Sequence, residues 1–174
     1  FYQIKTHFES LIKSFAFLQT MKICHQDLNP SNLFLDPSTN QIYFIDLSVS
    51  KDLIIKSSAE MKKEFSAKGS NLYFPPELDN VINNPSESIN LHKSDVFSLA
   101  LVFLELATLQ VPNKVFGATQ WKESIDNLLN RFGEIYKDLI NKDDKQILED
   151  FIKVLTSCLN FNPDKRPDFI ELFF

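Results

Sequence analysis

Two short apolar runs, with polar residues at their outer ends, place the strongest constraint on how this chain folds. The runs are 33–35 and 42–45, and the turn-forming residues 36–41 join them. Runs of this length around Asp, Pro, Ser and Asn are typical of a β-hairpin. Asn32 stands just before the first run and Asp46 just after the second. Because antiparallel strands bring these positions to one end of the pair, we expect Asn32 and Asp46 to lie close together.

The polar residues around this expected hairpin indicate phosphoryl-transfer chemistry. Transfer from Mg-ATP requires a group that orients a hydroxyl and oxygen ligands for Mg²⁺, which takes only one or two of them from the protein. Asp27 could accept the hydroxyl proton, and Asn32 and Asp46 could supply the ligands. Taken alone, Asp27 and Asn32 are more often ordinary turn residues around Pro30. The whole stretch nevertheless predicts a catalytic loop over 25–32 that uses ATP and Mg²⁺.

The remainder of the chain predicts mostly helix. The expected helices are 4–22, a helix capped by Ser94 that contains the apolar stretch 97–109, then 121–132 and 144–159. Asp95 would lie in the first turn of the helix at Ser94, where the helix dipole favours a carboxylate. Pro167 is expected to start a last short helix, and 47–72 and 79–92 are expected as polar loops. The stretch 97–109 is too short to span a bilayer, so no membrane segment is expected.

Composition indicates a folded, acidic chain. Of 174 residues, 44% are apolar, 17 are Phe and only 3 are Gly, as expected of one domain or a large part of one. The net charge of -5 argues against nucleic acid as a partner, because phosphate backbones require a basic surface. Cys24 and Cys158 cannot staple a fold of this size, so we expect two reduced thiols in an intracellular, cytoplasmic protein. Since the chain begins at Phe1 without a signal-peptide pattern, we expect it to be excised from a longer protein.

Five motifs, in order along the chain, resemble those of the eukaryotic protein kinase family. They are HQDLNPSN at 25–32 for H-R-D-L-K-P-x-N, DLS at 46–48 for D-F-G, GSNLYFPPE at 69–77 for G-T-x-x-Y-x-A-P-E, SDVFSL at 94–99 for S-D-V-W-S-L, and NPDKRP at 162–167 for D-P-x-x-R-P. Any one of them alone would be weak evidence. Together they imply a protein-kinase-like C-terminal lobe over 1–174, mainly α with a small β-hairpin. The activation segment would be 46–77 and the helical subdomain 94–174.

The resemblance implies roles in phosphoryl transfer for five residues. Asp27 corresponds to the catalytic base, and Asn32 and Asp46 to the residues that bind magnesium and, through it, ATP. Asn29 stands where most serine/threonine kinases carry a lysine that contacts the transferring phosphate, and its amide could still donate a neutral hydrogen bond there. Ser70 stands where these kinases place a Thr that bonds to the catalytic Asp and positions the substrate.

Four further residues are structural in this resemblance. His25 packs behind the catalytic loop, and the Asp95 carboxylate holds backbone N–H groups of that loop. Glu77 and Arg166 form a buried salt bridge between the end of the activation segment and the last helices. Read from sequence alone, both would be solvated turn charges beside prolines.

Departures from the family pattern limit what the resemblance implies. Asn29 replaces a cation at the phosphate, which is expected to weaken transfer without abolishing it. Gln26 replaces an Arg that grips a phosphate on the activation loop, so switching by that phosphorylation is not expected. Ser48 replaces the Gly of D-F-G, which restricts the backbone beside Asp46.

Three functions stay open at this level. The first is a protein serine/threonine kinase fragment acting on a protein hydroxyl, favoured over a tyrosine kinase by Pro30 and Ser31. The second is a pseudokinase or scaffold, and the third is a small-molecule phosphotransferase of the aminoglycoside or choline kinase type. The third is disfavoured because those enzymes lack segments like 69–77 and 94–99. No glycine-rich loop or strand lysine is present, so the N-terminal kinase lobe is expected to be missing and this chain alone is not expected to bind ATP tightly.

Overall fold

The computed structural model describes residues 1–47, 51–52, 72–83, 89–114 and 118–172, and these ranges are mainly helical. The helices are α1 (Tyr2–Thr20), α3 (Pro76–Asn83), α4 (Leu91–Thr108), α5 (Ala118–Lys137) and α6 (Lys145–Cys158), with 3-10 turns η1 (Pro30–Asn32), η2 (Lys142–Asp144) and η3 (Pro163–Lys165). The strands are β1 (Ile23–Cys24), β2 (Leu33–Asp36), β3 (Gln41–Phe44) and β4 (Lys51–Asp52). β2 pairs with β3, and β1 with β4, both antiparallel. The predicted fold class, mainly α with a small hairpin, is confirmed.

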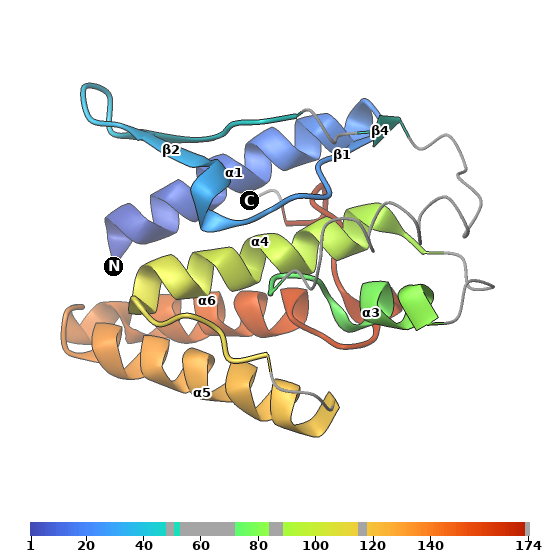
Figure 1. Cartoon of the computed structure of the whole chain (residues 1–174). Helices are drawn as coiled ribbons and strands as arrows, with labels where there is room; N and C mark the ends of the chain where they lie inside the picture. Colours follow the sequence, from blue (N-terminus) through green and yellow to red (C-terminus); the bar gives the residue numbers. More distant parts are fainter. Residues whose placement is uncertain (48–50, 53–71, 84–88, 115–117, 173–174) are drawn as a thin grey trace.

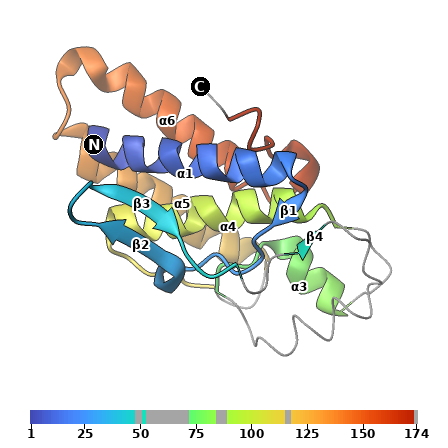
Figure 2. The same ribbon diagram turned by 90° about the horizontal axis from the view of Figure 1, so that it is seen from above.

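Helix α4 runs through the centre of the molecule, with α1 and the β2–β3 hairpin on one side and α5 and α6 on the other (Figure 1). From above, the hairpin lies beside α1 (Figure 2). Residues 94–104 of α4 are all buried, because this helix is apolar on nearly every face and must be covered all round. The α4 helix therefore forms the scaffold to which the segments of the candidate site are attached.

The start of α4 differs from the prediction. The helix begins at Leu91, and the Oδ1 atom of Asn90 accepts hydrogen bonds from the backbone N–H groups of His92 at 3.1 Å and Lys93 at 3.3 Å. Asn90 is therefore the N-cap, and the prediction of a cap at Ser94 with Asp95 in the first turn is wrong. The extra turn places Asp95 inside the helix, where its side chain is buried and available to other segments.

The hairpin and α1 pack together as their patterns predict. In α1, the buried residues Phe8, Leu11, Ile12 and Phe15 repeat at helical spacing. In the hairpin, Leu33 pairs with Phe44, and the Phe44 ring meets the Phe15 ring edge-on at 5.2 Å between centroids. The hairpin is confirmed, and its inner face is fixed against α1.

Helices α5 and α6 form the layer below α4. The predicted helix 121–132 is too short, because α5 continues through Gly133 to Lys137. A Cβ atom on Gly133 would lie 3.3 Å from Cδ1 of Ile152 on α6, so glycine allows close packing of the two helices there and does not end α5. The helix predicted at 144–159 is confirmed as α6.

Two other predictions of local structure are corrected. The segment 79–92 is not a continuous loop, since α3 reaches Asn83 after starting at Pro76, a residue suited to the first helical position. After Pro167, the described residues form only a turn, in which the N–H groups of Glu171 and Leu172 donate to the carbonyl of Asp168.

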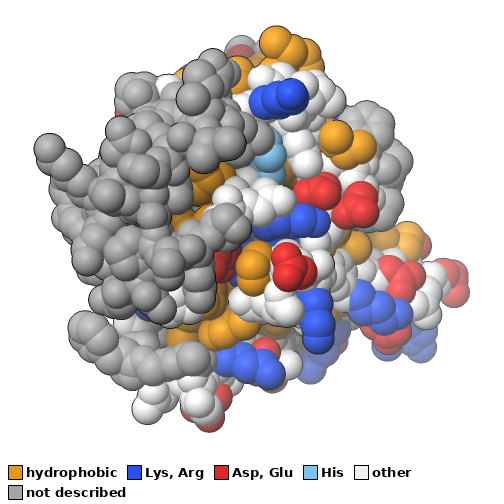
Figure 3. Space-filling model, turned by 90° about the vertical axis from the view of Figure 1, so that its right-hand side faces the viewer, with side chains coloured by type: hydrophobic (Ala, Val, Ile, Leu, Met, Phe, Trp, Pro, Cys, Tyr) orange, Lys and Arg blue, Asp and Glu red, His pale blue; other side chains and the backbone are white. Residues whose placement is uncertain are grey.

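The surface and the cysteines add little constraint on function. Acidic and basic side chains of the described residues are interspersed on the face shown in Figure 3. Cys24 and Cys158 are both buried and unbridged, and burial raises the pKa of Cys158 to about 12. Among the described helices, none combines the length and the apolar character that a membrane crossing requires.

Candidate active site

The catalytic loop is anchored to α4 by Asp95. The Asp95 carboxylate accepts the backbone N–H of His25 at 2.6 Å through Oδ2 and that of Gln26 at 3.0 Å through Oδ1. Gln26 has a φ of 64°, a left-handed conformation that is unfavourable for a residue with a side chain. Charge-assisted hydrogen bonds from these N–H groups to the buried carboxylate offset this cost. The structure thus brings Asp95 to the loop N–H groups, as the resemblance implied.

His25 lies behind the loop, in the interior. Its side chain is fully buried, with its ring 6.0 Å from that of Phe15 and 5.3 Å from that of Phe44. Its Nδ1 atom accepts the backbone N–H of Asp27 at 3.3 Å. These contacts give His25 a supporting position that links the core to the backbone of Asp27.

Asp27, Asn32 and Asp46 lie at one end of the hairpin. The Nδ2 group of Asn32 donates to the Asp27 carbonyl at 2.9 Å and to the Asp27 Oδ2 atom at 3.1 Å. The Asn32 carbonyl in turn accepts the backbone N–H of Ile45 at 2.8 Å, which brings the next residue, Asp46, beside Asn32. Asp46 has a φ of 70° and an exposed side chain. The hairpin therefore joins three residues that the sequence singled out separately.

The donor atoms at this end of the hairpin fit Mg²⁺. Because Nδ2 of Asn32 is bonded to Asp27, Oδ1 is the atom of this amide that could bind a cation. Asp46 would supply a carboxylate oxygen, and one or two hard oxygen ligands are what Mg²⁺ takes from a protein when phosphate completes its shell. In the part of the chain that the structure describes, no group of three or more His, Cys, Asp or Glu side chains could hold a metal ion. The candidate site therefore depends on the pair Asn32 and Asp46.

The Asn29 amide makes its hydrogen bonds within the loop itself. Its Oδ1 atom accepts the backbone N–H of Ser31 at 3.0 Å, which caps η1, and its Nδ2 group donates to the Asp27 carbonyl at 3.1 Å. Both ends of the amide are thus bonded within the loop. Asn29 braces the backbone around Asp27, and the sequence could not show this because the partners of an amide depend on the loop conformation around it.

Glu77 and Arg166 form a buried, two-pronged ion pair. The Arg166 Nη1 and Nη2 groups donate to the Glu77 Oε1 and Oε2 atoms at 2.5 and 2.7 Å. The Arg166 side chain is 0% exposed and that of Glu77 is 11% exposed. Ser94 on α4 donates to the same Oε1 atom at 2.9 Å. The end of the activation segment is therefore held to η3 and to α4 at one point.

Two further contacts near the site were missed at the sequence level. The Tyr73 hydroxyl donates to Oε2 of Glu105 at 2.6 Å, and Ser98 donates to the Tyr73 carbonyl at 2.8 Å. Burial, together with this bond to Glu105, raises the pKa of Tyr73. The available signal was Glu105 itself, the one charged residue within the apolar stretch 97–109.

A third contact that the sequence did not indicate is between Cys24 and His92. The Cys24 Sγ atom lies 3.3 Å from Nδ1 of His92, so α4 holds the residue just before the catalytic loop as well as the loop itself. Burial lowers the pKa of His92. No sequence pattern pointed to this pair, because its members are far apart in the chain.

Ser70 lies outside the described residues, as does most of the expected activation segment.

Comparisons with known proteins agree with this geometry. The sequence model of the protein kinase domain matches residues 2–173. A dual specificity mitogen-activated protein kinase kinase of Caenorhabditis elegans is 32% identical over 161 residues, 92% of this chain and 41% of that protein. A kinase and exchange factor for Rac of Dictyostelium discoideum is 29% identical over 169 residues, 93% of this chain and 14% of that protein. A putative serine/threonine-protein kinase/receptor of Acanthamoeba polyphaga mimivirus is 26% identical over 160 residues, 92% of this chain and 9% of that protein.

The chain thus spans less than half the length of these curated relatives. The match nevertheless extends over nearly all of its own residues, and the relatives are kinases by name, which disfavours the small-molecule phosphotransferase alternative. One conclusion follows from the family model, from the hairpin that joins Asp27, Asn32 and Asp46, and from the Glu77–Arg166 pair. This chain belongs to the protein kinase domain family.

Proposed function

We propose that this chain is the catalytic-loop part of a protein serine/threonine kinase that transfers the γ-phosphoryl group of ATP to a protein hydroxyl. The observation that supports this best is the pair of hydrogen bonds from Asn32 to Asp27, at 2.9 and 3.1 Å. They hold a carboxylate beside an amide whose remaining oxygen can bind Mg²⁺. The backbone bond from Ile45 to Asn32 adds the Asp46 carboxylate to the same end of the hairpin.

In the proposed reaction, the Asp27 carboxylate orients the serine or threonine hydroxyl and accepts its proton. The hydroxyl oxygen then bonds to the γ-phosphorus, the bond to the oxygen that bridges the β- and γ-phosphates breaks, and ADP leaves. Asn32 and Asp46 would hold Mg²⁺, which when bound neutralises charge on the phosphate oxygens. The Asp95 and His25 contacts keep the Asp27 backbone in place throughout, so little reorganisation is needed.

The test compares the full-length protein with its Asp27→Ala variant, using ATP labelled at the γ-phosphate and a protein acceptor. Loss of a positioned general base is expected to lower the rate by about 10^2 to 10^4-fold. Asp138→Ala is a matched control, because Asp138 is an exposed carboxylate just after α5 and outside the candidate site. Equal rates in the wild type and the Asp27→Ala variant would refute the proposed mechanism.

A second candidate function, a pseudokinase that keeps the fold for binding or scaffolding, is supported by Asn29. The position expected to bear a phosphate-binding lysine instead carries an amide that is bonded at both ends within the loop. The γ-phosphate then lacks one cation, and a missing preorganised donor costs on the order of 10^2 to 10^3 in rate. Stabilisation of the full-length protein by Mg-ATP, with no labelled product above the Asp27→Ala background, would favour the pseudokinase.

A further inference from the structure

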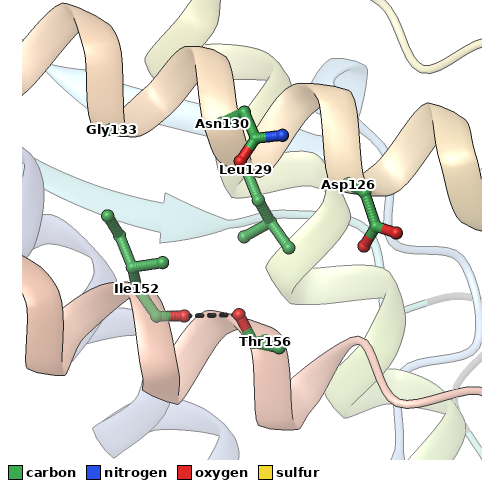
Figure 4. A pocket seen from close by; sticks show the side chains of 6 residues that line it. All are labelled: Asp126, Leu129, Asn130, Gly133, Ile152 and Thr156. Atoms are coloured by element: carbon green, nitrogen blue, oxygen red, sulfur yellow. Dashed lines mark hydrogen bonds between the residues drawn. The ribbon is translucent and has the colours of Figure 1, made fainter.

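We propose that the groove between α5 and α6 binds an arginine side chain of a partner protein. This proposal concerns the surface below α4 and does not depend on the kinase activity. The groove has a volume of about 450 Å³ and is lined by six residues, Asp126, Leu129, Asn130, Gly133, Ile152 and Thr156. Figure 4 shows them on the facing sides of the two helices.

The shape of the groove follows from helix periodicity. The α5 residues at 126, 129, 130 and 133 recur at intervals of three and four, so they share one face, and the two α6 residues are one turn apart. Gly133 has no side chain, and a Cβ atom there would lie 3.3 Å from Cδ1 of Ile152. Glycine therefore lets the helices approach each other while leaving a depression whose apolar floor includes Leu129, which is only 7% exposed.

The polar groups of the groove provide acceptors without a partner in the described part of the chain. Asp126 and Asn130, one turn apart, have exposed side chains, and neither makes a hydrogen bond or an ion pair with any described residue. Lys122 is one turn before Asp126 but does not pair with it, consistent with the weaker Lys-then-acid order along a helix. Thr156 donates its hydroxyl to the Ile152 carbonyl at 2.8 Å, which leaves its oxygen as an acceptor.

This set of groups matches an alkyl guanidinium. The hydrocarbon stem of the arginine can cover Leu129 and Ile152, while its planar N–H groups donate to the Asp126 carboxylate and to the side-chain amide oxygen of Asn130. An anion would be repelled by Asp126, and a purely apolar group would remove water from that carboxylate without replacing its hydrogen bonds. A lysine offers only a point charge in place of the fork, so arginine is the better occupant.

The probe for this site is N-acetyl-arginine N-methylamide, titrated into the full-length protein with labelled leucine and isoleucine methyl groups. The methyl resonances of Leu129 and Ile152 are expected to shift and saturate. The citrulline analogue, which has nearly the same shape but no charge, is expected to bind more weakly. Asp126→Asn should lower the affinity for the arginine probe by about three- to fivefold, which corresponds to the loss of one exposed ion pair.

A second groove variant and one control variant keep the test specific. Gly133→Ala places a methyl group in the groove and should also weaken the probe, whereas Asp138→Asn, outside the groove, should not. Melting curves of all variants establish that each is folded. The proposal is overturned if the groove methyl groups do not shift, if citrulline binds as well as arginine, or if Asp126→Asn leaves the affinity unchanged.

Discussion

Replacement of Glu77 by alanine is expected to destabilise this protein strongly, because it leaves a buried guanidinium without its counter-charge. Arg166 uses all five of its N–H groups. Two bind the Glu77 carboxylate at 2.5 and 2.7 Å, and the others donate to the carbonyls of Asn160 at 2.6 Å, Lys93 at 3.0 Å and Phe161 at 3.5 Å. Three neutral carbonyls would remain after the substitution, and no carboxylate.

The expected magnitude comes from the burial of the pair. With the Arg166 side chain 0% exposed, water cannot take the place of the carboxylate. Breaking such a pair from one side costs about 3–5 kcal/mol, a large share of the roughly 5–15 kcal/mol that stabilises a typical domain. For a chain of this size the melting temperature should fall by about 6–20 °C, at about 2–4 °C per kcal/mol.

Urea denaturation followed by circular dichroism measures the effect. Glu77→Gln retains the size of the side chain and one carbonyl oxygen, so the free energy of unfolding of this variant should lie between those of the wild type and Glu77→Ala. The double variant Glu77→Ala with Arg166→Met removes both charges and should recover part of the loss. Asp150→Ala is the control, because the Asp150–Lys153 pair is exposed and should contribute nothing measurable. A change of less than about 1 kcal/mol for Glu77→Ala would refute the account of the buried pair.

Three further outcomes are expected. In a kinase assay, Asn29→Lys should raise the rate of phosphoryl transfer by about tenfold or more over the wild type, whereas Asn29→Ala should not raise it. Equal rates for the wild type and Asn29→Lys would show that position 29 does not limit transfer. Burial lowers the pKa of His92 from its ordinary 6.5, so the folded state binds a proton less readily than the unfolded state, and the free energy of unfolding should fall as the pH drops below about 6.5. In urea titrations at several pH values, His92→Gln should reduce the dependence of the free energy of unfolding on pH. An unchanged pH dependence would contradict the assignment to His92. Leu109→Gly should stabilise the protein by about 0.5–1 kcal/mol, because Leu109 has a φ of 53° at the end of α4 and is 90% exposed; an unchanged or lower urea midpoint would contradict this.

Much of the candidate site could be predicted from sequence because its geometry is local. The turn-forming linker 36–41 and the two apolar runs that flank it specify a hairpin, and a hairpin brings the residues at its outer ends together. The proximity of Asn32 and Asp46 therefore follows from the residue pattern alone. The role of Asn29 could not be predicted in the same way, because which partner an amide selects depends on the loop conformation around it.

The sequence alone determined the helical periodicity, the hairpin and the order of the kinase motifs, since each depends on neighbours within a few residues. The tertiary structure decided which distant groups meet. Asp95 reaches the N–H groups of His25 and Gln26 across 70 and 69 residues, and Arg166 reaches Glu77 across 89. It also decided that Asn90 caps α4, one turn before the predicted cap at Ser94. Such contacts form only when a packed core removes water from the charged groups, so that each must find a partner inside the protein.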